Sequence, residues 1–299
     1  MRDASRALRH QRRATLRSSL AAAALIVGAG CTSTNDTSST AGTRTGGTTN
    51  RSGLTIRPAS APRADPPRVL LFSRTTGFRH DSIPEALRVL HDALTAARVD
   101  VVETEDAAAF SSERLAPLSA VVFVETTGDV LDDDQQRALE AFVRRGGGWA
   151  GVHSATDTEH EWPFYATLAG ARFANHGEIQ SGTVVISPSS SPHPSVTDLP
   201  GRWERVDEWY NFRANPRAPI AEDPTASPAR ILATLDEATV ASGATMGADH
   251  PLVWCRRIDA GRSWYSAMGH TVESWQDPRF IDHVAAGIIS VLPSQPDTC

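Results

Sequence analysis

The sequence predicts an α/β protein with a flavodoxin-like, doubly wound fold: a mostly parallel sheet with helices on both faces and an antiparallel hairpin extension near the C-terminus. Three observations support this prediction. Short apolar runs, typical of strands that a parallel sheet buries on both faces, recur along the chain. Segments with helical periodicity separate these runs, and two later strand-like runs flank a turn.

Three of the apolar runs, residues 68–73, 99–104 and 120–125, predict strands. The helix between the first two begins at Ser82 with Glu85 in capping-box spacing, and the helix after the third begins at Asp132 with Gln135. Glycines at 146–148 end that second helix, and a fourth buried strand follows. Strands and helices that alternate in this way wind right-handed into a parallel sheet, with ligand chemistry at the carboxyl ends of the strands.

The pattern changes near the C-terminus. Residues 251–258 and 262–268 are strand-like and are separated by Asp259-Ala260-Gly261, which predicts a hairpin. Residues 278–292 then carry apolar side chains at helical spacing. We therefore expect an antiparallel pair to extend the sheet and a last helix to cover it.

The N-terminus is typical of an export signal. Arginines dominate residues 1–17, and the apolar run 20–27 is too short to span a membrane. The run ends at Gly28-Ala29-Gly30-Cys31, which resembles a bacterial lipobox, although Gly28 stands where leucine is usual. We expect residues 1–31 to be a signal peptide with lipidation at Cys31, so that the protein is a cell-envelope lipoprotein, periplasmic or on the cell surface, with a membrane contact through its lipid anchor. The alternatives are an ordinary cleaved signal on a secreted protein and export by the twin-arginine route.

Residues 32–67 are rich in Ser, Thr, Gly and Pro and predict a disordered tether with an average reach of about 30 Å. Residues 68–293 suit one domain with one core, and 294–299 form a C-terminal tail. If Cys31 is lipidated, Cys255 and Cys299 remain. Two cysteines in an oxidising compartment suggest a disulfide, and two unpaired thiols are the alternative.

Charge excludes some functions. The formal net charge is −6 although the signal is basic, so the rest of the chain is more acidic still, which argues against a nucleic-acid partner. The sequence contains no lysine, which excludes a Schiff-base or lysine-base mechanism.

The most informative stretch is Gly151-Val152-His153-Ser154-Ala155. It has the form of a nucleophile elbow, in which small residues flank one side chain that a sharp turn exposes at the end of a strand. Histidine stands where the nucleophile is expected.

Four motifs resemble the ThuA-like (trehalose utilisation) family and occur in order along the domain: residues 75–83, 147–155, 207–212 and 261–270. The resemblance covers about residues 68–292. It implies a class I glutamine amidotransferase-like, flavodoxin-type fold and a link to sugar metabolism. Amidotransferases need a reactive thiolate at the elbow, which this chain lacks, so we exclude amidotransferase and thiol-protease activity.

Four histidines lie at the ends of predicted strands or in the loops after them: His80, His153, His176 and His270. Such positions converge on one edge of a doubly wound sheet. With nearby carboxylates they suit acid–base catalysis near neutral pH, or zinc. We expect the catalytic residues to be His153, His80, His270, Glu208 and Asp157. No compact metal-binding spacing is present, so a zinc ion held among His80, His153 and His270 rests on this convergence alone.

Trp209 and Tyr210 directly follow Asp207 and Glu208. A carboxylate can accept hydrogen bonds from sugar hydroxyls while an aromatic face packs on the ring. We therefore expect substrate contacts from Asp207, Trp209, Tyr210, His176 and Arg79. An ion pair with a neighbouring carboxylate is the alternative role of Arg79.

The sequence thus predicts an exported enzyme that acts on a carbohydrate, a keto-sugar or a glycoside, by histidine and carboxylate acid–base chemistry. One alternative is a non-catalytic sugar-binding or structural module on the same fold. The other is a zinc-dependent hydrolase.

Overall fold

The computed structural model describes residues 65–189, 192–220, 223 and 226–299. The predicted signal peptide, its lipidation at Cys31 and nearly all of the predicted tether at 32–67 lie outside the described residues. Within the described part of the chain, no helix is both long enough and apolar enough to cross a membrane.

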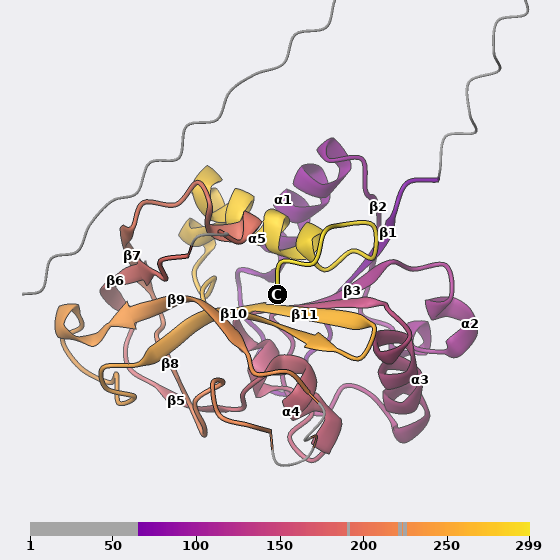
Figure 1. Ribbon diagram of the computed structural model, residues 1–299, viewed down its shortest axis with the longest axis horizontal. Helices are drawn as coiled ribbons and strands as arrows, with labels where there is room; N and C mark the ends of the chain where they lie inside the picture. The colour runs from indigo at the N-terminus through magenta and orange to yellow at the C-terminus, as the bar shows by residue number, and fades with distance from the viewer. Residues whose placement is uncertain (1–64, 190–191, 221–222, 224–225) are drawn as a thin grey trace, which may run out of the picture. The chain divides into compact units, whose positions relative to one another are not determined.

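A nine-stranded sheet forms the centre of the described structure (Figure 1). Its strand order is β2-β1-β3-β4-β11-β10-β9-β6-β7. The strands are β1 (Arg68–Phe72), β2 (Asp100–Thr104), β3 (Ala120–Val124), β4 (Gly148–Val152), β6 (Gln180–Ile186), β7 (Arg202–Asp207), β9 (Arg230–Asp236), β10 (His250–Ile258) and β11 (Gly261–Ser266). A separate two-stranded sheet pairs β5 (Phe173–His176) with β8 (Tyr210–Phe212).

The core of the sheet is parallel, as the alternating pattern predicts. The strands β2, β1, β3, β4 and β11 pair in parallel, and the order of the first four is the doubly wound order. The hairpin β10–β11 is present with a turn at Asp259 and Ala260. The antiparallel part is larger than the predicted hairpin, because β9, β6 and β7 continue it to the far edge.

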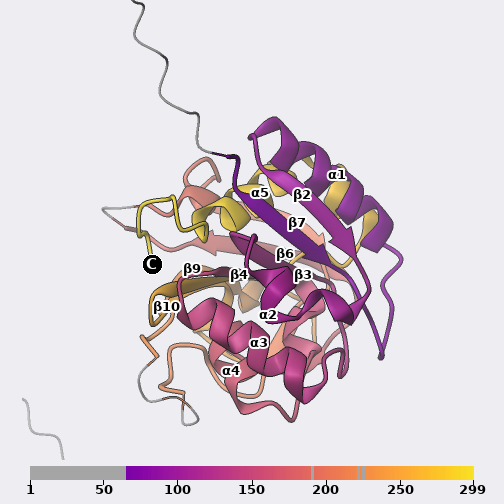
Figure 2. The same cartoon turned by 90° about the vertical axis from the view of Figure 1, so that its right-hand side faces the viewer.

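Helices cover both faces of the sheet. They are α1 (Ile83–Ala96), α2 (Ser112–Leu115), α3 (Asp133–Arg144), α4 (Pro163–Ala169) and α5 (Pro278–Ser290). Figure 2 shows α1 and α5 together on one face and α2, α3 and α4 on the other. The buried apolar side chains form one continuous core between these layers and the sheet.

Two details differ from the sequence predictions. Strand β2 is an edge strand whose residues are half-buried or exposed, so the expectation that it is buried on both faces was wrong. Ser82 precedes α1, but its hydroxyl does not cap the helix, whereas the predicted capping box of Asp132 and Gln135 is present. The hydroxyl of Ser82 instead bonds elsewhere, to groups near the site described below.

The C-terminal tail is held against the sheet. Cys255, inside β10, is joined to Cys299 by a disulfide with a Cα–Cα distance of 5.6 Å. Arg257 pairs with Asp297 at 2.9 Å, and Arg230 donates to the carbonyl of Thr298. These contacts tie residues 297–299 to strands β9 and β10.

Candidate functional site

The elbow after β4 has the strained geometry that its sequence predicts. His153 has a φ of 51°, in the left-handed region that side chains other than glycine rarely adopt. It begins a short 3₁₀ turn, His153–Asp157, and Tyr265 donates its hydroxyl hydrogen to the carbonyl of His153 at 2.6 Å. Gly151 is required on the approach, because a Cβ there would lie 2.3 Å from the ring of Trp149. The turn places the imidazole of His153 at the carboxyl edge of the parallel strands.

The two ring nitrogens of His153 have different surroundings. Nδ1 lies 2.9 Å from the carbonyl oxygen of Ala267, and because a carbonyl only accepts, Nδ1 carries the hydrogen. In the neutral ring, Nε2 is then an unprotonated acceptor. It lies 3.1 Å from Nε2 of His80, 3.1 Å from Nδ1 of His270 and 3.2 Å from the hydroxyl of Tyr210.

Glu208 supplies the carboxylate of this cluster. One oxygen, Oε2, lies 3.1 Å from Nδ1 of His270 and 3.7 Å from Nε2 of His153. The other, Oε1, lies 3.0 Å from Nδ1 of His176. The residues come from the loops after β1, β4, β7 and β11 and from β5, so convergence at one edge joins parts of the chain that are far apart in sequence. We call His80, His153, His270 and Glu208 the histidine cluster.

Burial and charge give the three imidazoles different proton affinities. Burial, together with the neighbouring His270, lowers the pKa of His80 to about 4. Burial and the neighbouring His80 also hold the pKa of His153 well below its ordinary value. For His270 burial acts in the same direction, but the hydrogen bond and charge of Glu208 outweigh it and raise the pKa. The cluster therefore combines two neutral imidazoles with one that holds its proton more tightly.

Asp207 supports the cluster from behind rather than facing the pocket. It is fully buried and accepts hydrogen bonds from the backbone N–H groups of Gly269 at 3.0 Å and His270 at 3.1 Å. Arg205 lies 3.6 Å from the same carboxylate. Asp207 thus fixes the backbone of His270, so the structure places it as a positioning group and not in the lining of the pocket.

A pocket of about 180 Å³ opens onto the cluster. It is lined by Phe78, His80, Thr127, Asp157, Phe173, His176, Glu208, Tyr210 and His270. Asp157 lies at this pocket and pairs with His160 at 2.8 Å. The lining therefore combines aromatic rings with imidazole, hydroxyl and carboxylate groups, the mixture expected of a small polar ligand's site.

Besides Asp207, two more of the predicted substrate-binding residues do not line this pocket. The indole of Trp209 is buried, donates to the carbonyl of Gln180 at 3.0 Å and lies against Gly182. Arg79 pairs with Glu105 at 2.6 Å and donates to the carbonyl of Ser73. Tyr210, the neighbour of Trp209, does line the pocket, because successive side chains in an extended chain point to opposite sides.

Three pocket residues were not predicted: Phe78, Thr127 and Phe173. Phe78 is the clearest omission, because it lies within the motif at residues 75–83 and is an exposed aromatic, with 67% of its surface accessible. An isolated aromatic residue in a loop between a predicted strand and helix was the available signal.

The donor set of the histidine cluster fits a metal ion. One ligand atom from each of His80, His153, His270 and Glu208 lies within 4.8 Å of the others. Two nitrogens bound to one tetrahedral zinc ion at about 2.0–2.1 Å stand about 3.3 Å apart, close to the 3.1 Å separations from Nε2 of His153. The nitrogens thus face one another as zinc ligands do, with a carboxylate beside them.

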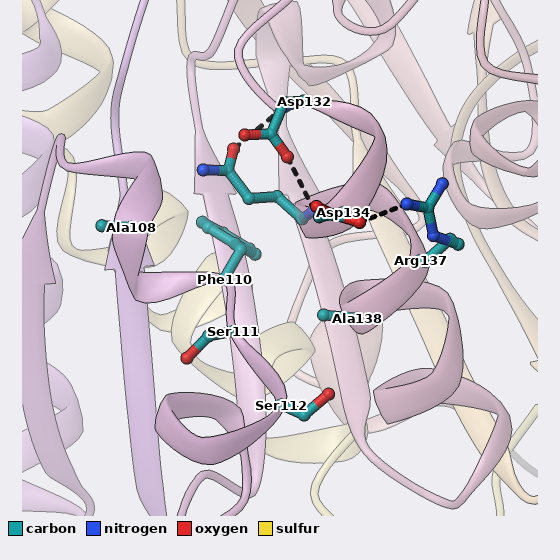
Figure 3. A pocket seen from close by; sticks show the side chains of 9 residues that line it. Ala108, Phe110, Ser111, Ser112, Asp132, Asp134, Arg137 and Ala138 are labelled. Atoms are coloured by element: carbon teal, nitrogen blue, oxygen red, sulfur yellow. Dashed lines mark hydrogen bonds and ion pairs between the residues drawn. The ribbon is translucent and has the colours of Figure 1, made fainter.

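A second hollow, of about 520 Å³, lies beside the start of α3 (Figure 3). Its charged groups are engaged locally: Asp132 accepts from the backbone of Gln135 at 2.9 Å, and Asp134 pairs with Arg137. None of the residues that line it is a histidine or a cysteine. We therefore assign the chemistry to the smaller pocket at the histidine cluster.

The fold and the site together define an α/β protein of flavodoxin-like type whose elbow carries a histidine cluster in place of a thiol. The chain belongs to the ThuA family, described as trehalose utilisation, whose model matches residues 68–289.

Solved structures show the same fold. A ThuA-like protein from Bacteroides uniformis is 19% identical, with a TM-score of 0.62 over 80% of this chain and 98% of the other. A ThuA-like protein from Parabacteroides merdae is 20% identical, with a TM-score of 0.61 over 78% and 92%. A cytoplasmic protein from Salmonella typhimurium is 14% identical, with a TM-score of 0.52 over 75% and 99%. No curated protein matches the chain.

Proposed function

We propose that this protein is an exported enzyme that acts on a carbohydrate, a keto-sugar or a glycoside, by acid–base chemistry of the histidine cluster. The observation that carries the proposal is the convergence of His153 with His80, His270 and Glu208 at a strained elbow that opens onto a pocket. Backbone strain of this kind is concentrated at active sites, where the surrounding structure maintains it. Export rests on the basic and apolar pattern of residues 1–31.

In this proposal His153 is the general base. Its Nδ1 hydrogen is fixed on the carbonyl of Ala267, and its low pKa keeps Nε2 unprotonated at neutral pH. His270 is the general acid, because its proton is held by Glu208 at 3.1 Å. The ring nitrogens of this neutral base and this protonated acid lie 3.1 Å apart. In one reaction the base can accept a proton from one group of the substrate, and the acid can donate a proton to another.

The lining of the pocket supports a sugar as the ligand. The rings of Phe78, Phe173 and Tyr210 provide apolar faces on which a sugar ring can pack. Asp157, His176 and Thr127 provide acceptors and donors for hydroxyl groups. The family description, trehalose utilisation, points to the same class of substrate.

A zinc-dependent hydrolase is the second candidate, favoured by the four donor atoms within 4.8 Å of one another. His80, His153 and His270 would hold the ion, with Glu208 beside them, and the bound ion would supply an activated water molecule. In this version Tyr210, whose hydroxyl lies 3.2 Å from Nε2 of His153, and His176 would orient the substrate.

The experiment is a substrate screen with the purified full-length protein. Trehalose and other disaccharides are supplied unoxidised and with one hydroxyl oxidised to a ketone, and products are detected by chromatography. We expect turnover of at least one sugar and a loss of about 10²–10⁴-fold in His153→Ala. His91→Ala is the control, because His91 is exposed and pairs with Glu103 outside the site.

The outcomes separate the candidates. Turnover that requires zinc, lost with a chelator and restored by the ion, supports the hydrolase. Sugar binding without turnover supports the sugar-binding module, and turnover that is equal in wild type and His153→Ala contradicts the proposed site.

A further inference from the structure

Glu125 occupies the position after β3 that His153 occupies after β4. The two strands are neighbours, and both residues have a positive φ, 52° for Glu125 and 51° for His153. The side chain of Glu125 is fully buried. Two features of Glu125 are energetically unfavourable: its backbone lies in the left-handed region, and an ionisable group is buried. Both call for a structural explanation.

The carboxyl group of Glu125 has two partners, and both also bond the turn that carries His270. Oε2 lies 2.7 Å from the hydroxyl of Ser82, which lies 2.8 Å from the carbonyl oxygen of His270. Oε1 accepts from the indole N–H of Trp275 at 3.0 Å, and that N–H also lies 2.9 Å from the carbonyl oxygen of Gly269. Glu125 is therefore connected to two successive carbonyl groups of the 269–270 turn.

The hydrogen bonds around this carboxyl group indicate whether it is protonated. The hydroxyl of Ser82 has one hydrogen, and the carbonyl of His270 can only accept, so both contacts are hydrogen bonds only if that hydrogen points to His270. The 2.7 Å contact between Ser82 and Glu125 then needs a hydrogen from Glu125. The same arrangement explains why Ser82 does not cap α1: its hydroxyl is engaged on the other side.

The electrostatic surroundings of Glu125 also favour its protonated form. Burial raises the pKa of Glu125 to about 8, and the charge of Asp207 acts in the same direction. The hydrogen bond from Trp275 acts the other way but does not outweigh burial. Tyr210 is within electrostatic reach of Glu125 and is held neutral by its own burial, which raises its pKa. Arg205 is engaged with Asp207 and Asp277.

Asp207 and Glu125 hold opposite sides of the same turn. Asp207 accepts from the N–H groups of Gly269 and His270, which requires a carboxylate. The partners of Glu125 hold the carbonyl groups of the same two residues, which requires donors. One ionised and one protonated carboxyl group therefore match the donors and acceptors of the turn.

We propose that Glu125 is a positioning residue that acts as a neutral carboxylic acid and, through Ser82 and Trp275, holds the 269–270 turn so that His270 stays in the histidine cluster. This inference deepens the proposed function and rests on it for its catalytic meaning, but its test needs no turnover.

The test compares Glu125→Gln with wild type in the full-length protein. Glutamine keeps an oxygen for Trp275 and supplies N–H donors for Ser82, so it copies the neutral acid. We expect it to fold and to leave the side-chain NMR signals of His270 in place, whereas Glu125→Ala shifts them. Asp207→Asn is the matched control and is expected to lose stability, because an amide N–H would face the backbone donors of the turn.

Unfolding in urea is then measured across pH. A group whose folded pKa is raised loses stabilising effect as pH rises from its unfolded pKa, 4.5, toward about 8. The folding equilibrium constant of the wild type should fall by up to about tenfold per pH unit across that window relative to Glu125→Gln. Infrared spectra at neutral pH should show a protonated carboxyl band that Glu125→Gln lacks.

Three results would overturn the inference. The first is an absence of that band together with identical pH dependence in wild type and Glu125→Gln. The second is a Glu125→Gln protein as destabilised as Asp207→Asn. The third is a folded Glu125→Ala protein with unchanged His270 signals. If Glu125→Ala does not fold, the infrared and pH comparisons with Glu125→Gln still decide. None of these depends on whether the protein turns over a sugar.

Discussion

Nε2 of His153 lies 3.1 Å from Nδ1 of His270, and the surroundings of the two rings drive their pKa values in opposite directions. Burial and His80 keep His153 neutral, whereas the hydrogen bond and charge of Glu208 favour the proton on His270 despite burial. The different surroundings of the two rings are the reason why the proposed chemistry assigns the role of acid to His270 and the role of base to His153.

Replacing Phe78 with alanine should weaken substrate binding with little effect on folding. Phe78 lines the pocket and is 67% exposed, so the ring contributes little to the core. Loss of one aromatic face should raise KM by about three- to tenfold and leave kcat nearly unchanged. Steady-state kinetics on the substrate found in the screen measure this. The matched control is Val102→Ala, an exposed apolar residue on the edge strand β2. A fall in kcat at unchanged KM would show that Phe78 is not a substrate contact.

Stability should decline on acidification because buried histidines outside the site must stay neutral. Burial lowers the pKa of His193 to about 3, with the charge of Arg230 adding to it, and that of His283 to about 4. The unfolded chain binds these protons near the ordinary value of 6.5, so the folded protein loses up to about 1.4 kcal/mol per pH unit for each histidine as pH falls from about 6.5 toward 4.

The variant His283→Gln tests this directly. Glutamine can replace the contacts of the ring with the carbonyl of Ser195 and the hydroxyl of Ser266 without titrating. Urea unfolding from pH 7 to 4.5 should give a shallower decline in the variant than in the wild type. Equal slopes would mean that folding leaves the pKa of His283 unchanged.

The disulfide between Cys255 and Cys299 should stabilise the domain. It closes a loop with a sequence separation of 44, which in the chain-entropy model contributes about 4 kcal/mol. Cys299→Ser should therefore lower the melting temperature, and a thiol reductant should lower that of the wild type but not of the variant. If the reductant lowers the melting temperatures of the wild type and of the variant equally, a group other than this disulfide is responsible for the sensitivity to reduction.

The fold could be predicted because its signals are local. The apolar runs that became β1 and β3 and the capping box of Asp132 are each set by a few neighbouring residues, and all three lie within the residues that the ThuA family model matches. Strands β6, β7 and β9 were missed because their burial depends on partners far along the chain, as in β7, where buried and exposed residues alternate.

The site could be predicted only in part. The chain order of strands indicates which loops share an edge, which is how His80, His153 and His270 could be grouped. It does not give the direction of each side chain, so Trp209 and Tyr210 could not be told apart although only one lines the pocket. Ser82 fits a capping pattern perfectly well in sequence, and only tertiary contacts with Glu125 and His270 redirect its hydroxyl.

We propose that His153 and its neighbours form an active site. This is tested most directly by the turnover rate of His153→Ala beside that of His91→Ala on the best substrate of the screen, with circular dichroism to verify that both variants are folded. We expect a loss of about 10²–10⁴-fold for His153→Ala and a rate close to wild type for His91→Ala. A folded His153→Ala protein that keeps the wild-type rate would contradict it.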